Sequence, residues 1–262
     1  MICNVKHFTT AVVAERYVHP MYSMEPEAVV AAVTGLAAPV VRDGTATGRR
    51  EWSWDFCINY FSATDDPTAE MEKSCLQLGY YLASWGMLRG SSWLFKNAHP
   101  RHYTATIEMI ARHSPIVRDL DLSDYTDTQA RAALISAYAD IRDALLPDGN
   151  EHATAVTKVM LGVWGNIPAF DTYLRAGLRS IVSPAERAAF NTVNDRSLEL
   201  LNRIYRENQG VIDQLADSQI TVAFSDHAAP SRSYTRAKVL DAAGFALGEQ
   251  LLAGPDRSDE AL

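Results

Sequence analysis

Runs of apolar residues at steps of three and four, closed by helix start and stop signals, most constrain the fold of this chain. The clearest run extends from Ala69 to Met87 and ends before Gly90; its apolar positions are Met71, Cys75, Leu78, Leu82 and Trp85. This spacing places one apolar face on an α-helix, and that face must be buried. The pattern predicts a helix here and favours an all-α protein.

Start signals predict further helices along the chain. Ser91 and Ser92 stand where an N-cap is expected before Trp93, and Asn150 can cap a helix over 151–163. Thr126 and Gln129 form a capping box that opens a helix to Ala144 or Leu145. The strong start signal Ser183, Pro184 and Glu186 predicts a long helix to about Arg206. A further helix is predicted over 235–252. Only 219–224 and the stretch around 39–41 look extended, which is too little for a central sheet.

Composition bounds the domain organisation. The 262 residues are 47% hydrophobic and 21% charged, and no linker rich in Gly, Ser and Pro divides them. We therefore expect one compact, two-lobed helical domain over 1–262, with 255–262 as a frayed tail. The first residues lack a secretory signal and no run of 18 apolar residues exists, so the expected location is cytoplasmic. The three cysteines, Cys3, Cys57 and Cys75, support neither a disulfide framework nor a zinc site.

Charge argues against a protein that coats nucleic acid by bulk electrostatics. The formal net charge is −8, yet the segment 86–118 is locally cationic, with Arg89, Lys96, Arg101, Arg112 and Arg118 against Glu108. Within it, Arg89, Ser91 and Ser92 follow a helix end and precede a helix start, which suits a phosphate-binding corner. The alternative is an ordinary turn between two helices with an exposed arginine.

Asp171 is the most informative polar position. The segment 157–174 predicts a helix, a turn bounded by Gly162 and Gly165, then Pro168 and a second helix that begins near Asp171. Its carboxylate can cap backbone amides and project into a cleft at the helix N-terminus. The alternative is an Asp that does no more than cap the helix.

The same segment carries a family resemblance. Val163, Gly165, Pro168, Asp171 and Tyr173 resemble a shortened signature of the helix-hairpin-helix DNA glycosylases. Thr157 and Lys158 followed by Pro168-x-x-Asp171 are similar to bacterial proteins described as 8-oxoguanine-glycosylase-like, and the stretch 234–241 resembles the final helix of that group.

The resemblance implies a site and an activity. It makes Asp171 the catalytic carboxylate of a DNA glycosylase that hydrolyses the N-glycosidic bond of a flipped, modified base and leaves an abasic site. The substrate would be double-stranded DNA carrying 8-oxoguanine or a hypermodified base, such as the glucosylated hydroxymethylcytosine of phage DNA, and the role would be anti-phage defence. Lys158 lies before the turn, whereas the Schiff-base lysine of bifunctional members lies after it, so the resemblance favours a monofunctional enzyme with Lys158 as a catalytic or phosphate contact.

The remaining site residues are expectations from residue type. Contacts to DNA are expected from Arg89, Ser91, Ser92, Lys96, Asn166 and Arg175, and a base pocket from Asn59, Tyr60 and Trp85. Trp85 also completes the apolar face of its helix, which favours core packing. No phosphate loop or nucleophile elbow is present, so no cofactor is predicted, and a monomer is preferred.

Two other classes of function stay open. One is a non-catalytic, acidic helical adaptor for a protein partner, which would show an exposed apolar patch and no cleft beside Asp171. The other is a metal-dependent hydrolase, which would need the rings of His99, His102 and His113 close together. Metal binding is not predicted, because no carboxylate or cysteine stands at ligand spacing.

Overall fold

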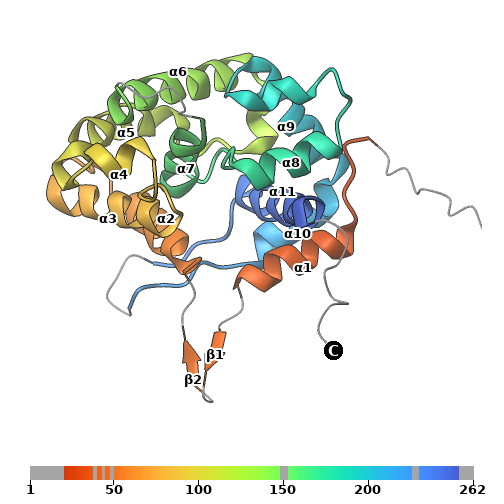
Figure 1. Ribbon diagram of the computed structural model, residues 1–262, viewed down its shortest axis with the longest axis horizontal. Helices are drawn as coiled ribbons and strands as arrows, with labels where there is room; N and C mark the ends of the chain where they lie inside the picture. The colour runs from red at the N-terminus through yellow and green to blue at the C-terminus, as the bar shows by residue number, and fades with distance from the viewer. Residues whose placement is uncertain are drawn as a thin grey trace, which may run out of the picture.

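The computed structural model describes residues 21–37, 40–42, 45–47, 50–147, 153–225 and 230–253, and these residues are mostly helical (Figure 1). The α-helices are α1 (Pro26–Ala37), α2 (Trp52–Ala63), α3 (Met71–Ser84), α4 (Trp93–Asn97), α5 (Thr104–Val117), α6 (Thr128–Leu145), α7 (Ala153–Val163), α8 (Thr172–Ser180), α9 (Asp195–Glu207), α10 (Gln209–Ser218) and α11 (Arg236–Ala253). Short 3-10 helices are η1 (Pro100–Tyr103), η2 (Leu122–Thr126) and η3 (Arg187–Asn191). The strands β1 (Val40–Arg42) and β2 (Thr45–Thr47) pair antiparallel. The prediction of a mostly α-helical protein is confirmed.

Most helix boundaries lie close to the predicted ones. Ser92 caps α4 by accepting a hydrogen bond from the Phe95 N–H at 3.2 Å, as expected. The cap of α6 is Asp127 and not Thr126, because the Asp127 side chain is the one that accepts from the Gln129 N–H. The predicted cap at Asn150 and the predicted tail lie outside the described residues.

The long helix predicted from Ser183 to Arg206 is wrong. The Glu186 carboxylate accepts hydrogen bonds from the Ser183 N–H and hydroxyl and from the Tyr22 hydroxyl, which closes a turn in place of a helix start. The helix α9 begins later, where Asn194 and Ser197 cap each other's backbone N–H groups. A complete capping box therefore determines the start of the helix.

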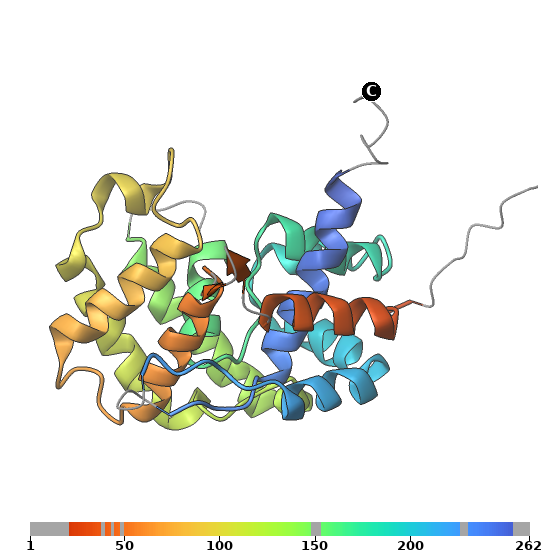
Figure 2. The same ribbon diagram turned by 90° about the horizontal axis from the view of Figure 1, so that it is seen from below.

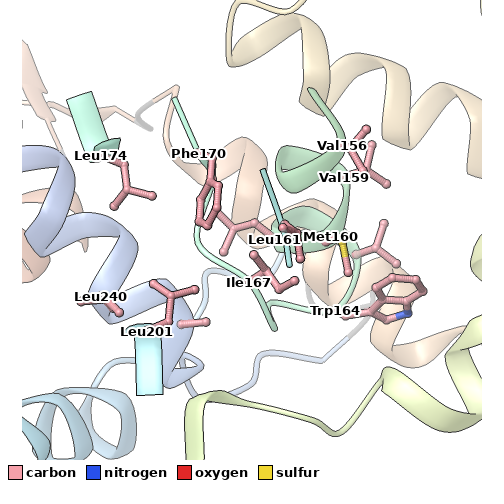
Figure 3. Close-up of a cluster of buried hydrophobic side chains, with 14 of the residues drawn as sticks. Val156, Val159, Met160, Leu161, Trp164, Ile167, Phe170, Leu174, Leu201 and Leu240 are labelled. Atoms are coloured by element: carbon pink, nitrogen blue, oxygen red, sulfur yellow. The ribbon is translucent and has the colours of Figure 1, made fainter. Parts of the chain in front are cut away.

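The helices form two groups around a shared core. Figure 1 shows α2 to α6 on one side and α1 with α8 to α11 on the other, with α7 between them. The side chains of α7 and of the turn after it are buried, and Figure 3 shows Val156, Met160 and Ile167 in one cluster with Leu201 and Leu240 from the second group. Burial of this apolar surface holds the two groups together.

A connection from α10 to α11 crosses between the groups. It runs from α10 across to α2 and back to α11 (Figure 2). The predicted strand at 219–224 reduces to a single bridge between Ile220 and Ser233, and the Thr221 hydroxyl donates to the Asn59 side chain of α2 at 2.7 Å. Within the described part of the chain, no helix is both long and apolar enough to cross a lipid bilayer.

The helices α8 and α11 approach each other through glycines. A Cβ added to Gly177 would lie 2.1 Å from the Gly244 carbonyl oxygen, and one added to Gly248 would lie 1.8 Å from the Tyr173 carbonyl oxygen. Real Cβ atoms do not approach backbone oxygens so closely, so larger residues would push the helices apart. This interface fixes the position of α8 relative to α11.

We expect Gly248→Ala to lower the free energy of unfolding by at least about 1–3 kcal/mol, because the new methyl group overlaps the backbone of α8. Urea denaturation measures the change. The matched control is Gly210→Ala in α10, where a Cβ meets no atom within 4 Å. There, alanine should leave stability unchanged or raise it by about 1 kcal/mol. Equal effects at both positions would contradict close packing of α8 on α11.

Candidate active site

The Asp171 carboxylate stands at the start of α8, as the sequence predicts. Its backbone is extended, and its Oδ1 accepts a hydrogen bond from the Leu174 N–H at 2.9 Å. The other oxygen, Oδ2, lies 3.3 Å from the Lys158 Nζ of α7. One carboxylate oxygen thus caps the helix, while the other takes part in an ion pair.

Lys158 is buried and faces this carboxylate. Its side chain is 5% exposed, and its Nζ also lies 5.0 Å from the centre of the Trp85 ring. Of the two roles expected for Lys158, a catalytic or a phosphate contact, its burial against Asp171 does not support the phosphate contact. Its place before the turn does not keep it from Asp171, because the turn at Gly165 (φ +69°) reverses the chain and returns Asp171 to the side of α7.

The loop that carries Asp171 is held by side chains from two helices. On one side, the Thr157 hydroxyl of α7 accepts from the Phe170 N–H at 2.8 Å, and the Thr154 hydroxyl donates to the Phe170 carbonyl at 2.8 Å. On the other side, the Asp241 Oδ1 of α11 accepts from the Ala169 N–H at 2.9 Å. These hydrogen bonds fix the backbone immediately before Asp171.

A second pair of lysine and aspartate lies on α11. The Lys238 Nζ lies 3.2 Å from the Asp241 Oδ2, and its side chain is 5% exposed. The same amine lies 5.0 Å from the centre of the Trp54 ring and 5.2 Å from that of Trp85. Trp85 therefore contacts the amines of both buried lysines, which is a favourable arrangement for cations.

Both lysine–aspartate pairs, Lys158 with Asp171 and Lys238 with Asp241, line one pocket of about 50 Å³ together with Trp85. The lining also includes Arg50, Glu51, Tyr81, Leu161, Ala242 and Phe245. Such a volume holds a few water molecules. The Arg50 guanidinium lies 5.5 Å from the centre of the Trp85 ring, and its side chain is 64% exposed, so it can move away from the pocket at little cost.

Burial alters the acidity of groups around the pocket. Burial raises the pKa of Asp55 to about 7, although the Lys238 charge and hydrogen bonds at Val222 and Tyr234 favour the ionised form. The Asp55 Oδ1 is buried and has no hydrogen-bond partner in the described structure. Burial also raises the pKa of Tyr81, and the nearby Asp241 and Asp171 add to this effect. Asp55 can therefore hold a proton near neutral pH.

Sequence reasoning found part of this pocket and missed part of it. Asp171, Lys158 and Trp85 come together as a site, so Trp85 lines the pocket beyond its place on the apolar face. Lys238 and Asp241 line the same pocket and were not predicted, and neither was Asp55 of α2, which lies near Lys238 outside the pocket lining. For Lys238 and Asp241 the available signal was a helix over 235–252 with small or apolar residues on most sides, so that a charged residue on it must find a partner.

The other two predicted base-pocket residues lie elsewhere. Asn59 is buried, and its amide donates to the Val222 carbonyl and accepts from Thr221, so it fastens the connection between α10 and α11. The Tyr60 hydroxyl pairs with the Ser74 Oγ at 2.8 Å. Neither side chain lines the pocket beside Asp171, so the structure does not join Asn59 and Tyr60 with Trp85 in one pocket.

The residues predicted to contact DNA differ in whether their side chains are buried or exposed. Asn166 is fully buried and donates to the Val117 carbonyl at 3.0 Å, so a contact with DNA is wrong for it. Ser92 is occupied as a helix cap. Arg175 lies beside the site, since its Nε is 3.3 Å from the Asp171 carbonyl. Arg89 is exposed and packs against Gly86, next to Trp85; Ser91 and Lys96 are also exposed.

The three histidines do not form a metal centre. The His102 Nε2 bonds to the Leu145 carbonyl, and the His113 Nε2 bonds to the Asp140 carboxylate, both at 2.8 Å. Across the residues that the structure describes, no three side chains of His, Cys, Asp or Glu could hold a metal ion together. The hypothesis of a metal-dependent hydrolase finds no support there.

Comparison with known proteins adds no relative. No family model matches the chain, and neither a curated protein nor a solved structure matches it.

Proposed function

We propose that this protein is a monofunctional DNA glycosylase of the helix-hairpin-helix type, with Asp171 as the catalytic carboxylate. The observation that carries the proposal is the Asp171 carboxylate, fixed by the α8 N-terminus and paired with the buried Lys158 in a pocket walled by Trp85. A carboxylate that only capped a helix would not need a buried lysine or an aromatic wall.

The chemistry of N-glycosidic hydrolysis suits this arrangement. The bond breaks through an oxocarbenium-like state, so positive charge grows on the sugar. A carboxylate held rigidly beside C1′ stabilises that charge and can orient a water molecule for attack. Lys158, paired with Asp171 as an ammonium ion, keeps the carboxylate in place and is not itself a nucleophile.

The pocket must open to admit a flipped base, since about 50 Å³ is too small for a nucleobase. Arg50 is the residue best placed to move, because its exposed guanidinium covers Trp85. Once it moves, the Trp85 ring offers a flat surface for stacking. A base with a bulky substituent, as in hypermodified phage DNA, would need the widest opening.

The experiment is incubation of the protein with DNA duplexes that each carry one modified base, followed by mass spectrometry of the released bases. We expect release of at least one base and an abasic site in its strand. Borohydride should not trap the protein on DNA. A trapped adduct that disappears in Lys158→Ala would replace the monofunctional mechanism with one that uses a Schiff base. No release from any duplex would contradict the proposed activity.

We expect the variant in which Arg89 and Arg175 are both changed to alanine to bind all DNA sequences more weakly. Each lost phosphate contact reduces the slope of log affinity against log salt by about one, so the slope should fall by about two. Fluorescence anisotropy across a salt series measures this. The control is Arg206→Ala, an exposed arginine in α9 that does not line the pocket. An unchanged slope in the double variant would place the DNA-binding surface elsewhere.

A second function, that of a protein-binding adaptor, is favoured by a different surface. Leu76 and Tyr80 of α3 lie beside Phe224 in an open groove, and these side chains are 49%, 68% and 76% exposed. Exposed apolar side chains that lie together are typical of interaction sites. If no duplex releases a base and the protein does not bind DNA, this adaptor function becomes the better proposal.

A further inference from the structure

We propose that Lys238 is a second catalytic residue, which stabilises the negative charge on the departing base. This inference rests on the proposed glycosylase activity and extends it to the substrate class. When the N-glycosidic bond breaks, positive charge grows on the sugar and negative charge grows on the base. Asp171 can stabilise only the first of these charges, so the second requires a cation or a hydrogen-bond donor.

The geometry distinguishes the two lysines of the pocket. Lys158 is paired with Asp171, the group that faces the sugar in the proposed mechanism. Lys238 is paired with Asp241, whose other oxygen is taken by the Ala169 N–H. Of the two buried lysines of this pocket, Lys238 is therefore the one that is not held by the proposed catalytic carboxylate.

The surroundings of Lys238 also favour an incoming acceptor. An ammonium group has three N–H donors. Within the described residues the Lys238 ammonium donates one hydrogen bond, to the Asp241 carboxylate. The rings of Trp54 and Trp85 lie against the amine, and the buried Asp55 lies close enough for the Lys238 charge to favour its ionised form. The Trp85 Nε1 is buried and has no hydrogen-bond partner in the described part of the chain. Buried donors are stabilised by an oxygen acceptor, and the carbonyl oxygen of a base is one.

The substrate class follows from this charge. Pyrimidines and 8-oxopurines carry a carbonyl oxygen next to the glycosidic nitrogen and leave as anions, so an ammonium group at that oxygen assists their departure. Purines alkylated on the ring are already cationic and leave as neutral bases. An ammonium group opposes their binding and gives their departure no help. We infer that the substrates belong to the first class.

The step balances in atoms and electrons. The electron pair of the C1′–N bond moves to the base, which leaves as an anion while its oxygen accepts a hydrogen bond from the Lys238 ammonium. A water molecule adds its oxygen to C1′ and gives its proton to Asp171. Asp171 then passes that proton to solvent, and the released base takes a proton from solvent, which restores the starting state.

The test measures single-turnover release from duplexes that contain uracil, 5-fluorouracil, 5-hydroxymethylcytosine, glucosylated 5-hydroxymethylcytosine, 8-oxoguanine or 7-methylguanine. We expect the wild type to release at least one of the pyrimidines or 8-oxoguanine faster than it releases 7-methylguanine. Lys238→Met should slow that release by about 10²-fold to 10³-fold, the usual loss for a donor at a developing charge. Lys238→Arg should recover part of the rate, because it restores the positive charge.

Controls separate this role from a structural one. Lys73→Met, at an exposed lysine of α3 outside the pocket, should leave the rate unchanged. Thermal melting shows whether Lys238→Met is folded; if it is not, Lys238→Gln replaces it. Full activity of the folded variant, no recovery with Lys238→Arg, or fastest release of 7-methylguanine would each overturn the inference and leave the glycosylase proposal standing. No release of any base by the wild type would overturn both.

Discussion

Asp171→Asn is expected to lower base release by about 10²-fold to 10³-fold while the protein stays folded and binds DNA. Asparagine is as good an N-cap as aspartate, so its side-chain oxygen can still accept from the Leu174 N–H. What the variant loses is the negative charge beside the sugar and the ion pair with Lys158. Single-turnover rates on the best duplex measure the loss.

The chain offers a matched control for this substitution. Asp127 is also an N-cap, at α6, where its side chain accepts from the Gln129 N–H at 2.8 Å. Asp127→Asn should therefore leave base release unchanged. If Asp171→Asn shows full activity and a stability loss of only about 1 kcal/mol, Asp171 is a helix cap and the catalytic assignment is wrong.

The wild type is expected to lose stability as pH rises from about 4 to about 7, and Asp55→Asn should remove this loss. Burial raises the pKa of Asp55 to about 7 in the folded protein, whereas an unfolded chain ionises it near 4. Between these values the folded state binds more protons than the unfolded state, so the free energy of unfolding falls as pH rises. The full difference is on the order of 4 kcal/mol, because each pKa unit corresponds to about 1.4 kcal/mol.

Urea denaturation from pH 4 to pH 8 checks this for the wild type and the variant. Other groups titrate in both proteins, so the difference between the two curves isolates Asp55. The variant should become more stable than the wild type as pH approaches 8, since asparagine cannot ionise beside its buried neighbours. Parallel curves would show that Asp55 titrates normally in the folded state.

Local signals in the sequence predicted the helical fold and the position of Asp171 at the start of a helix. Asp171 is recognisable because a proline turn and a capping carboxylate are determined by adjacent residues. The same applies to Ser92 before α4. The error at Ser183 arose where a distant partner decided the outcome, since Tyr22 and Arg196 both bind the Glu186 carboxylate. No local pattern carries that information.

The rest of the pocket depends on contacts between distant segments. Lys238 and Asp241 have the spacing of an ordinary surface ion pair, and only the packing of α11 against neighbouring elements buries them. Asn59 and Asn166 have side chains suited to binding a base or a phosphate, yet both are used to satisfy backbone carbonyls. Residue type indicates what chemistry a side chain can perform, and the tertiary structure decides which partner it finds.

The glycine contact between α8 and α11 brings the backbones of these two helices together, so Asp171 just before α8 and the Lys238–Asp241 pair on α11 are held in one relative position. Thr154 and Thr157 of α7 bond to Phe170, which ties the same loop to the helix of Lys158. Both lysine–aspartate pairs therefore sit on a frame fastened from two sides. Widening of the pocket falls to Arg50, whose exposed side chain can swing away while both pairs keep their geometry.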